Sequence, residues 1–355
     1  MAVYTTIDNP GLFFNTVLWS GNSSTQSVTG VGFQPDWVWV KNRSASQPNI
    51  VQDIVRGKSG SNFQYLFTNT TAAEAVQPDN DGIQSFDTDG FSMNHTDSGG
   101  WNESGSNYVG WSWKAGGTAS SNSDGSITSS VSANTTAGFS IVSYTGTGSN
   151  ATVGHGLGVA PSMIIIKARS ATESWTVYHK DLTSAAYNLT LNDTSAEANN
   201  PSHFNSTAPT SSVFSIGTSG RVNVSSQTQI AYCFAGKQGY SKFGSLTGNG
   251  NADGAFVYTG FKPAWIMYKR TNSGADDSWV IADNKRDIDN VVQKYIFADQ
   301  SNAEGTTNFV DFLSNGFKYR LADNTTNGSG NSYIYMAFAE NPFVTAGTKA
   351  AGTAR

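Results

Sequence analysis

Three copies of one sequence pattern follow one another along the 355-residue chain, and this repeat constrains the fold more than any other feature. Each copy contains a Gly-x-x-Pro motif and an apolar stretch, with a lysine six positions after the proline. The landmarks are Pro35 and Lys41, Pro161 and Lys167, and Pro263 and Lys269. Each copy ends on a second apolar stretch, at residues 108–113, 230–234 and 333–338. We therefore expect three similar units.

The composition of the copies favours β-structure. Only 13% of the residues are charged and 12% are aromatic, and short β-branched or aromatic runs lie between Gly, Asn, Asp and Ser turns. This pattern predicts an all-β fold with three tandem β-sandwich-like repeats of about 100 residues each. The apolar stretches 37–40, 163–166 and 265–268 are expected to occupy equivalent core positions. One helix is expected, at 287–297, where apolar residues approximate a 3.6-residue period.

The spacing of the landmarks sets the expected domain boundaries. The prolines of the first and second copies lie further apart in the sequence than those of the second and third. The difference is about the length of the Ser-, Asn- and Gly-rich stretch between the first two copies, which has the composition of a linker. We predict repeats at 1–116, 139–244 and 245–343, a linker at 117–138 and a C-terminal tail at 344–355. The second and third repeats should abut, while the first should be tethered by the linker.

Charge and cysteine content exclude several classes of protein. The net charge is −5, and the sequence has no basic cluster of the kind that duplex-DNA binders show. The longest apolar runs are far shorter than a membrane-spanning helix, and the first residues do not resemble a secretion signal. A single cysteine, Cys233, rules out an intramolecular disulfide and a cysteine-based zinc cage. We expect no nucleic-acid partner, no membrane insertion and synthesis in a reducing cytoplasm.

Charged residues shared by the copies have two interpretations. Lysines and arginines follow the first apolar stretch of each copy, and two copies carry an Asp-x-x-Arg pair. The residues are Lys41, Arg43, Lys167, Arg169, Lys269 and Arg270, with the pairs Asp53–Arg56 and Asp283–Arg286. They would form an anion or sugar site in every unit, or they would finish a strand and pair across a turn. We favour the second interpretation.

Other candidate chemistry is weak. The four histidines share no close metal-ligand spacing with one another or with Cys233, and the acidic clusters at 79–81, 87–89 and 249–253 lack the spacing of a helical calcium loop. No acidic pair recurs in all three copies, so we expect no catalytic residues, no cofactor and no metal. Trp111 and Trp113 are candidate surface aromatics for stacking on a sugar, although alternating aromatics on a closing strand more often belong to a core.

Residues 156–169, 258–269 and 333–343 carry a resemblance to a known family. They resemble the virion-associated β-repeat proteins of marine tailed phages, especially those of cyanophages, and residues 2–10 and 138–142 are also similar. The resemblance covers roughly residues 2–343. It implies a non-enzymatic structural component exposed on a phage particle, of the tail-fibre, appendage or capsid-decoration type. The motifs identify the family better than an activity, and they carry over no catalytic residue.

The resemblance also implies partners and a location. We expect a virion protein, assembled in the host cytoplasm, that contacts other virion proteins and a host-surface glycan. A homo-oligomer is expected, because an aromatic-rich chain with few charges leaves apolar and hydroxyl-bearing surface for subunit contacts. The resemblance implies a trimer, since that is the usual state of phage fibres and decorations. Met1, Pro10, Ala346 and Arg355 mark the ends expected to dock on other virion proteins. The alternative is a carbohydrate-binding or polysaccharide-degrading tailspike-like protein, although such enzymes usually contain a long parallel β-helix.

Overall fold

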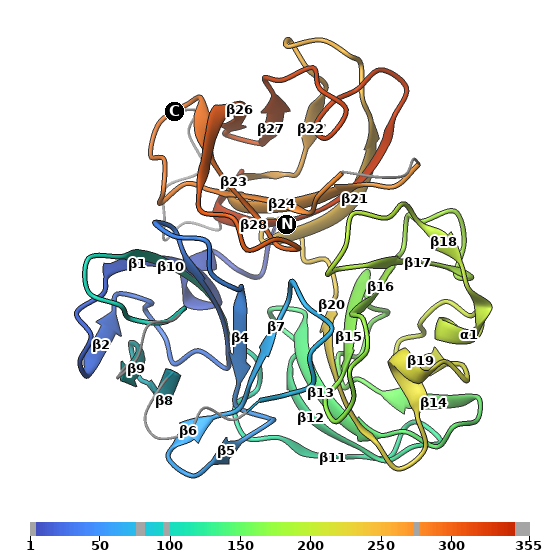
Figure 1. The fold of residues 1–355 in the computed structure, drawn as a ribbon. Coiled ribbons are helices and arrows are strands. Elements are labelled where there is room, and N and C mark those ends of the chain that lie inside the picture. The colour runs from blue at the N-terminus through green and yellow to red at the C-terminus, as the bar shows by residue number, and fades with distance from the viewer. Residues whose placement is uncertain (1–4, 76–81, 95–99, 273–276, 345–355) are drawn as a thin grey trace.

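Strand pairing divides the chain into three lobes that surround a common centre (Figure 1). The computed structural model describes residues 5–75, 82–94, 100–272 and 277–344. Within this part of the chain, the named strands pair only inside lobe 1 (residues 14–113), lobe 2 (120–234) or lobe 3 (241–342). The fold is all-β, and each helical element in the described residues is about one turn long.

Lobe 1 consists of an inner sheet that faces the centre and an outer sheet. The inner sheet has the order β1 (Phe14–Ser20), β10 (Asn107–Trp113), β3 (Trp37–Asn42), β4 (Ile50–Asp53) and β7 (Tyr65–Phe67). The outer sheet contains β2 (Gln26–Thr29), β9 (Gly90–Asn94) and β8 (Gly82–Asp87). A 3-10 turn, η1 (Pro10–Leu12), precedes β1, and β5 (Lys58–Ser59) pairs with β6 (Asn62–Phe63).

Lobe 2 repeats this arrangement, and its inner sheet has two additional strands at one edge and one at the other. Its inner sheet has the order β11 (Ser120–Asn122), β12 (Ser129–Asn134), β13 (Phe139–Thr145), β20 (Thr228–Phe234), β15 (Met163–Ala168), β16 (Thr176–His179), β17 (Tyr187–Thr190) and β18 (Ala198–Asn199). Its outer pair is β14 (Ala151–Gly154) and β19 (Val213–Ile216). Two one-turn helices, α1 (Pro201–Phe204) and α2 (Gly220–Asn223), connect these strands.

Lobe 3 joins its inner and outer strands into one eight-stranded sheet. The order is β21 (Ser241–Thr247), β28 (Ser332–Pro342), β23 (Phe261–Arg270), β24 (Val280–Asp283), β25 (Val292–Phe297), β26 (Gly305–Leu313), β27 (Gly316–Tyr319) and β22 (Phe256–Tyr258). Thus β3, β15 and β23 are equivalent in the three lobes, as are the closing strands β10, β20 and β28.

The repeated apolar stretches form strands that are buried on both faces. In β3, the side chains of Trp37 and Trp39 belong to the central cluster, whereas Val38 and Val40 belong to the interior of lobe 1. The equivalent strands β15 and β23 alternate in the same way between the centre and their own lobe. Burial on both faces explains why these stretches are continuously apolar rather than alternating with polar residues. They occupy equivalent core positions, as predicted.

The repeated Gly-x-x-Pro motif has a backbone explanation. Gly32, Gly158 and Gly260 have φ values of 83°, 70° and 82°. This is the left-handed region, in which glycine avoids the steric cost that a side chain would incur. Each glycine turns the chain ahead of its central strand, and this requirement accounts for the glycine in all three copies.

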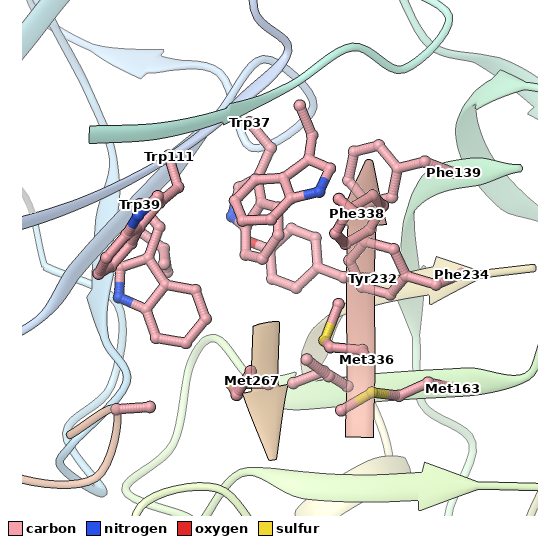
Figure 2. Close-up of a cluster of buried hydrophobic side chains, with 14 of the residues drawn as sticks. Trp37, Trp39, Trp111, Phe139, Met163, Tyr232, Phe234, Met267, Met336 and Phe338 are labelled. Carbon is pink, nitrogen blue, oxygen red and sulfur yellow. The ribbon is translucent and has the colours of Figure 1, made fainter. Parts of the chain in front are cut away.

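One apolar cluster at the centre is shared by all three lobes (Figure 2). It includes Trp37 and Trp113 from lobe 1, Tyr232 from lobe 2, and Trp265 and Phe338 from lobe 3. The rings of Trp37 and Tyr232 stack at 4.5 Å across the lobe 1–lobe 2 boundary, and those of Trp113 and Trp265 meet edge-on at 5.6 Å. A separate apolar cluster fills the interior of each lobe. Sheet pairing is therefore local to each lobe, while the central packing is common to all of them.

The predicted linker at 117–138 is wrong. Two strands of lobe 2, β11 and β12, lie in this segment, and β12 pairs with β13 along the edge of the inner sheet. Val131 is buried in the lobe 2 cluster, whereas exposed serines such as Ser121 and Ser130 give the segment the composition of a linker. Lobe 1 is not tethered at a distance, because its inner sheet packs against both other lobes.

Two further predictions need correction. The segment 287–297 contains the strand β25 rather than a helix, because its apolar residues pair with β24 and β26 instead of forming one helical face. The boundary at 244/245 falls inside β21, whose pairing with β28 begins at Ser241. In the part of the chain that the structure describes, no helix is long and apolar enough to cross a membrane.

Candidate functional site

The three repeated lysines connect the lobes at the ends of equivalent strands. Each ammonium donates hydrogen bonds to backbone carbonyl oxygens of its own lobe and of a neighbouring lobe. Lys41 reaches Ser301 of lobe 3 (2.7 Å), Lys167 reaches Thr71 of lobe 1 (3.2 Å), and Lys269 reaches Thr194 of lobe 2 (2.9 Å). Burial lowers the pKa of each lysine to about 8. Each lobe gives one lysine and receives one, so the three contacts close a ring.

A second set of contacts follows the same cyclic order. The side chains of Asn49, Trp175 and Trp279 stand at equivalent positions before β4, β16 and β24. They donate hydrogen bonds to the backbone carbonyls of Phe297 (3.1 Å), Phe67 (2.8 Å) and Thr190 (2.9 Å), respectively, in the neighbouring lobes. Two independent sets of hydrogen bonds therefore fix the same arrangement of lobes.

A buried ionic network lies at the lobe 1–lobe 2 interface. Arg56 Nε donates to Asp53 Oδ2 at 2.5 Å, and both side chains are fully buried. Glu74 connects Arg56 (3.3 Å) to Arg169 of lobe 2 (2.8 Å), and the hydroxyl of Tyr232 donates to Asp53 at 2.7 Å. Burial opposes the charge of Arg56, but Asp53 and its other neighbours keep its pKa above the ordinary value.

The lobe 3–lobe 1 interface contains the same network in equivalent residues. Arg286 Nε donates to Asp283 Oδ2 at 2.6 Å, and Glu304 connects Arg286 (3.2 Å) to Arg43 of lobe 1 (2.9 Å). Trp111 takes the place of Tyr232, and its Nε1 donates to Asp283 at 3.0 Å. Both predicted Asp-x-x-Arg ion pairs are thus confirmed. Their partners across the lobe boundary were not predicted.

The lobe 2–lobe 3 interface has a different chemistry. His179 and Leu182 replace the aspartate and arginine, and Met336 stands where the other closing strands have Trp111 and Tyr232. His179 Nε2 lies 3.3 Å from the carbonyl oxygen of Tyr335, and burial lowers the histidine pKa to about 4. The backbone N–H of Glu197 donates to the carbonyl oxygen of Thr271. Thr271 is the residue of lobe 3 that is equivalent to Arg43 and Arg169 in the other lobes. Arg270 pairs instead with Asp277 of its own lobe at 2.9 Å.

Three clefts lie between the lobes, each beside the start of an equivalent central strand. Cleft 1/2 includes Asp36 before β3, cleft 2/3 includes Ser162 before β15, and cleft 3/1 includes Ala264 in β23. Their volumes are about 520, 340 and 180 Å³, respectively. They lie at the opposite end of these strands from the lysine ring, because each lysine is near the C-terminal end of its strand. The pseudo-symmetry of the lobes thus creates three comparable hollows on the surface.

The three clefts differ in charge. Cleft 1/2 is lined by one acid, Asp36, and one base, Lys114, and burial raises the pKa of Asp36. Cleft 3/1 likewise has one base, Lys285, and one acid, Glu340. Cleft 2/3 is lined by three lysines, Lys180, Lys237 and Lys242, and by no carboxylate among the residues that the structure describes. It is the one described cleft of the three with a single sign of charge.

The predicted surface aromatics are in the core. Trp111 and Trp113 are both 0% exposed and belong to the central cluster, so neither can stack on a ligand at the surface. Of the docking residues, Pro10 is buried in η1, which leaves little of its ring for a partner. Met1, Ala346 and Arg355 lie outside the described residues. The site predicted from aromatic strand ends is therefore wrong.

His155 and His203 make contacts within lobe 2. His155 Nε2 lies 3.2 Å from the carbonyl oxygen of Thr210, and His203 Nε2 lies 3.4 Å from the amide nitrogen of Asn200. Burial lowers the pKa of both rings. Across residues 5–75, 82–94, 100–272 and 277–344, no cluster of histidine, cysteine or acidic side chains could hold a metal ion. His95 and the acidic residues 79–81 fall outside these ranges.

Sequence reasoning missed the residues that receive the inter-lobe contacts. One glutamate occupies the equivalent position in each lobe: Glu74, Glu197 and Glu304. Each lies three residues after the residue whose carbonyl oxygen accepts a hydrogen bond from a repeated lysine. The spacing is visible in the sequence as a Thr or Ser followed three residues later by Glu. It lies outside the apolar landmarks that align the copies, so the alignment does not include it.

Comparison with known proteins gives one match. A family model described as a domain of unknown function (DUF7483) matches residues 9–342. The match spans all three lobes and the segments that connect them. No curated protein and no solved structure matches the chain.

Proposed function

The chain belongs to the DUF7483 family, and we propose that it is a non-enzymatic structural component of a tailed-phage virion. A tail fibre, an appendage or a capsid decoration fits this proposal equally well. The resemblance of residues 2–343 to virion-associated β-repeat proteins suggests the particle, since the family description assigns no function. The proposed location is the virion, after assembly in the host cytoplasm, with other virion proteins and the host surface as partners.

The proposal rests on one observation: the repeated charged residues hold the lobes together. The lysines form the inter-lobe ring, and the two Asp-x-x-Arg pairs form the buried networks between lobes. The residues that would be the first candidates for a repeated reactive site are thus engaged in holding three lobes together. A rigid body with a common core suits a particle component, which must keep its shape while exposed to solvent.

The oligomeric state remains a prediction, but many of the aromatic side chains that were expected to join subunits are buried inside the chain. All nine tryptophans of the chain are buried, and the centre of the molecule uses much of the aromatic surface that was expected to join subunits. The exposed large apolar side chains include Leu12, Leu18, Val159, Phe256 and Ile288. A trimer would have to use contacts of this kind together with polar surface.

Purified particles provide the direct test. An antibody against the chain should label particles in electron micrographs, and its tryptic peptides should copurify with virions through a density gradient. Deletion of residues 346–355 should leave the thermal unfolding temperature unchanged, since β28 ends at Pro342, but should reduce incorporation into particles. Absence of the chain from purified virions would overturn the proposal. Release of reducing ends from host polysaccharide by the purified chain would favour the enzyme alternative.

A further inference from the structure

The three lysines of cleft 2/3 are not required by the fold. Lys180 follows His179 at the position that Ile54 and Asn284 occupy after the equivalent strands of the other lobes. Lys237 lies in the turn that connects β20 to β21, and Lys242 lies in β21. The two pseudo-equivalent clefts each balance one base with one acid. The same scaffold is therefore built without this concentration of positive charge.

These lysines also keep hydrogen-bonding capacity that the buried lysines have used. No described residue accepts a hydrogen bond from the ammonium of Lys237. Lys242 donates to the carbonyl oxygen of Tyr258 at 2.6 Å, which leaves two of its three N–H donors. Lys180 pairs with its neighbour Asp181 at 2.8 Å, a contact that solvent weakens. The cleft thus presents several unused donors.

The charges face a common space. Burial lowers the pKa of Lys242, and the charge of Lys180 lowers it further, so these two ammonium groups repel each other across the cleft. An anion between them would replace this repulsion with charge-assisted hydrogen bonds, which are among the strongest polar contacts in proteins. The attraction would be local, because the chain as a whole has a net charge of −5.

An exposed aromatic ring borders the same cleft. Tyr258 is 48% exposed at the end of β22, and the ammonium of Lys242 lies 5.2 Å from its ring centroid. The hydroxyl-bearing residues Ser162 and Thr259 also line the cleft. Its volume of about 340 Å³ is within the range of roughly 300–1,000 Å³ that is usual for small-molecule sites. An aromatic face beside ammonium groups suits a ligand that has an apolar ring face and an acidic substituent.

We propose that cleft 2/3 binds an acidic saccharide, with Lys237 and Lys242 contacting its carboxylate or sulfate group and Tyr258 contacting the sugar ring. The proposal deepens the host-surface role of the proposed particle component and rests on it for its biological setting. The binding itself is measured on the isolated chain. Failure of saccharide binding would leave particle incorporation untouched, and the reverse also holds, so the two proposals can fail separately.

Isothermal titration calorimetry of the full chain at low salt tests the proposal. The titrants are a hexamer of galacturonic acid, a sulfated glucose hexamer, a neutral glucose hexamer and inorganic sulfate. One of the two acidic saccharides should bind, whichever carries the recognised substituent, and binding should weaken as salt screens the charges. Neither acidic hexamer binding, or the neutral hexamer binding equally well, would overturn the proposal. Inorganic sulfate binding as tightly as the better hexamer would overturn the assignment of a saccharide.

Variants locate the site. The double variant K237Q/K242Q should weaken binding at least about tenfold, because it removes two charge-assisted contacts. The matched control K114Q/K285Q, which alters the other two clefts, should change binding less than about twofold if cleft 2/3 is the site. Y258A should weaken saccharide binding, whereas F256A on the same strand should not. Unchanged binding in K237Q/K242Q, with an unfolding temperature equal to that of the wild type, would refute the site.

Discussion

The interfaces of lobe 1 differ from the interface between lobes 2 and 3, although the same strands form all three. Lobe 1 meets each neighbour through a buried aspartate, two arginines and a bridging glutamate. Lobes 2 and 3 meet through His179, Leu182 and Met336 at the equivalent positions. The lysine ring is present at all three interfaces. So is a backbone hydrogen bond across the boundary, which the N–H groups of Glu74, Glu197 and Glu304 donate.

The comparison separates what the arrangement requires from what it tolerates. Contacts that end on backbone carbonyls recur three times, so they define the positions of the lobes. The ionic networks occur twice and are replaced once by His179 together with apolar side chains. This is in keeping with the small net gain expected from a buried ion pair over apolar residues of similar volume. Removing a single member of a network should destabilise the fold strongly, because the remaining buried charges lose their partners.

The largest effect is expected from Arg56→Leu, which gives lobe 1 the residue that lobe 2 has at Leu182. Asp53 and Glu74 would remain buried or partly buried without their shared cation. We expect the free energy of unfolding to fall by about 3–5 kcal/mol, measured by urea denaturation. The matched control Leu182→Met preserves apolar volume and should cost less than about 1.5 kcal/mol. Equal losses in both variants would show that the two interface types do not differ.

A smaller loss is expected when one member of the lysine ring is removed. Lys167→Met eliminates donors to the carbonyls of Thr71, Ala168 and Ala171 and leaves these oxygens with fewer partners. The free energy of unfolding should fall by about 2–3 kcal/mol in the same assay. The exposed Lys180→Met should change it by no more than about 0.5 kcal/mol. A neutral result for Lys167→Met would mean that the ring does not stabilise the lobes.

Acid should affect the lobe 2–lobe 3 interface through His179. Burial lowers its pKa to about 4, whereas an unfolded histidine has a pKa of about 6.5. Between these values the unfolded chain binds a proton that the folded chain does not, so stability falls as pH decreases. The folded ring faces Asp181 and Lys180 of its own segment and the Tyr335 carbonyl of β28.

The His179→Asn variant isolates this contribution. Its side chain can accept the N–H of Asp181 as the histidine Nδ1 does, but it does not titrate. Between pH 7 and pH 5, the wild type should lose about 2 kcal/mol more stability than the variant. Parallel curves of unfolding free energy against pH for the two proteins would contradict the assignment. His155 and His203 are present in both proteins and cancel from the comparison.

The smallest effect is an expected gain. Thr271→Arg would give lobe 3 the arginine that Arg43 and Arg169 supply elsewhere, opposite Glu197. The pair would be partly exposed, so the gain should be about 0.5 kcal/mol at low salt and should shrink when salt is added. A loss of stability would indicate that the apolar interface has no room for the added side chain.

The sequence predicted the repeated strands well because their signals are local. The Gly-x-x-Pro motif, the apolar stretch and the closing strand each lie within a few residues, and their equivalence follows from spacing alone. The all-β class follows from the same short runs. Strand β12 was missed because Ser129–Asn134 alternates small hydroxyl residues with few apolar ones, so composition concealed a strand at the edge of a sheet.

Contacts between lobes were beyond sequence reasoning for a physical reason. Lys167 and Thr71 are 96 positions apart, and nothing local indicates that one donates to the other. The placement of Trp111 and Trp113 in a shared centre likewise depends on three lobes meeting there, which a single repeat does not reveal. Cleft 2/3 was missed because its lysines, dispersed at 180, 237 and 242, form no charge cluster in the sequence.

Calorimetric unfolding of the intact chain tests the central claim that three lobes with separate sheets share one core. If the centre and the lysine ring couple the lobes, differential scanning calorimetry should show a single transition. Its calorimetric and van't Hoff enthalpies should then agree, with a ratio of about 1. Two or three resolved transitions, each with the enthalpy of one lobe, would contradict the claim, because they would show that the lobes unfold independently despite their shared contacts.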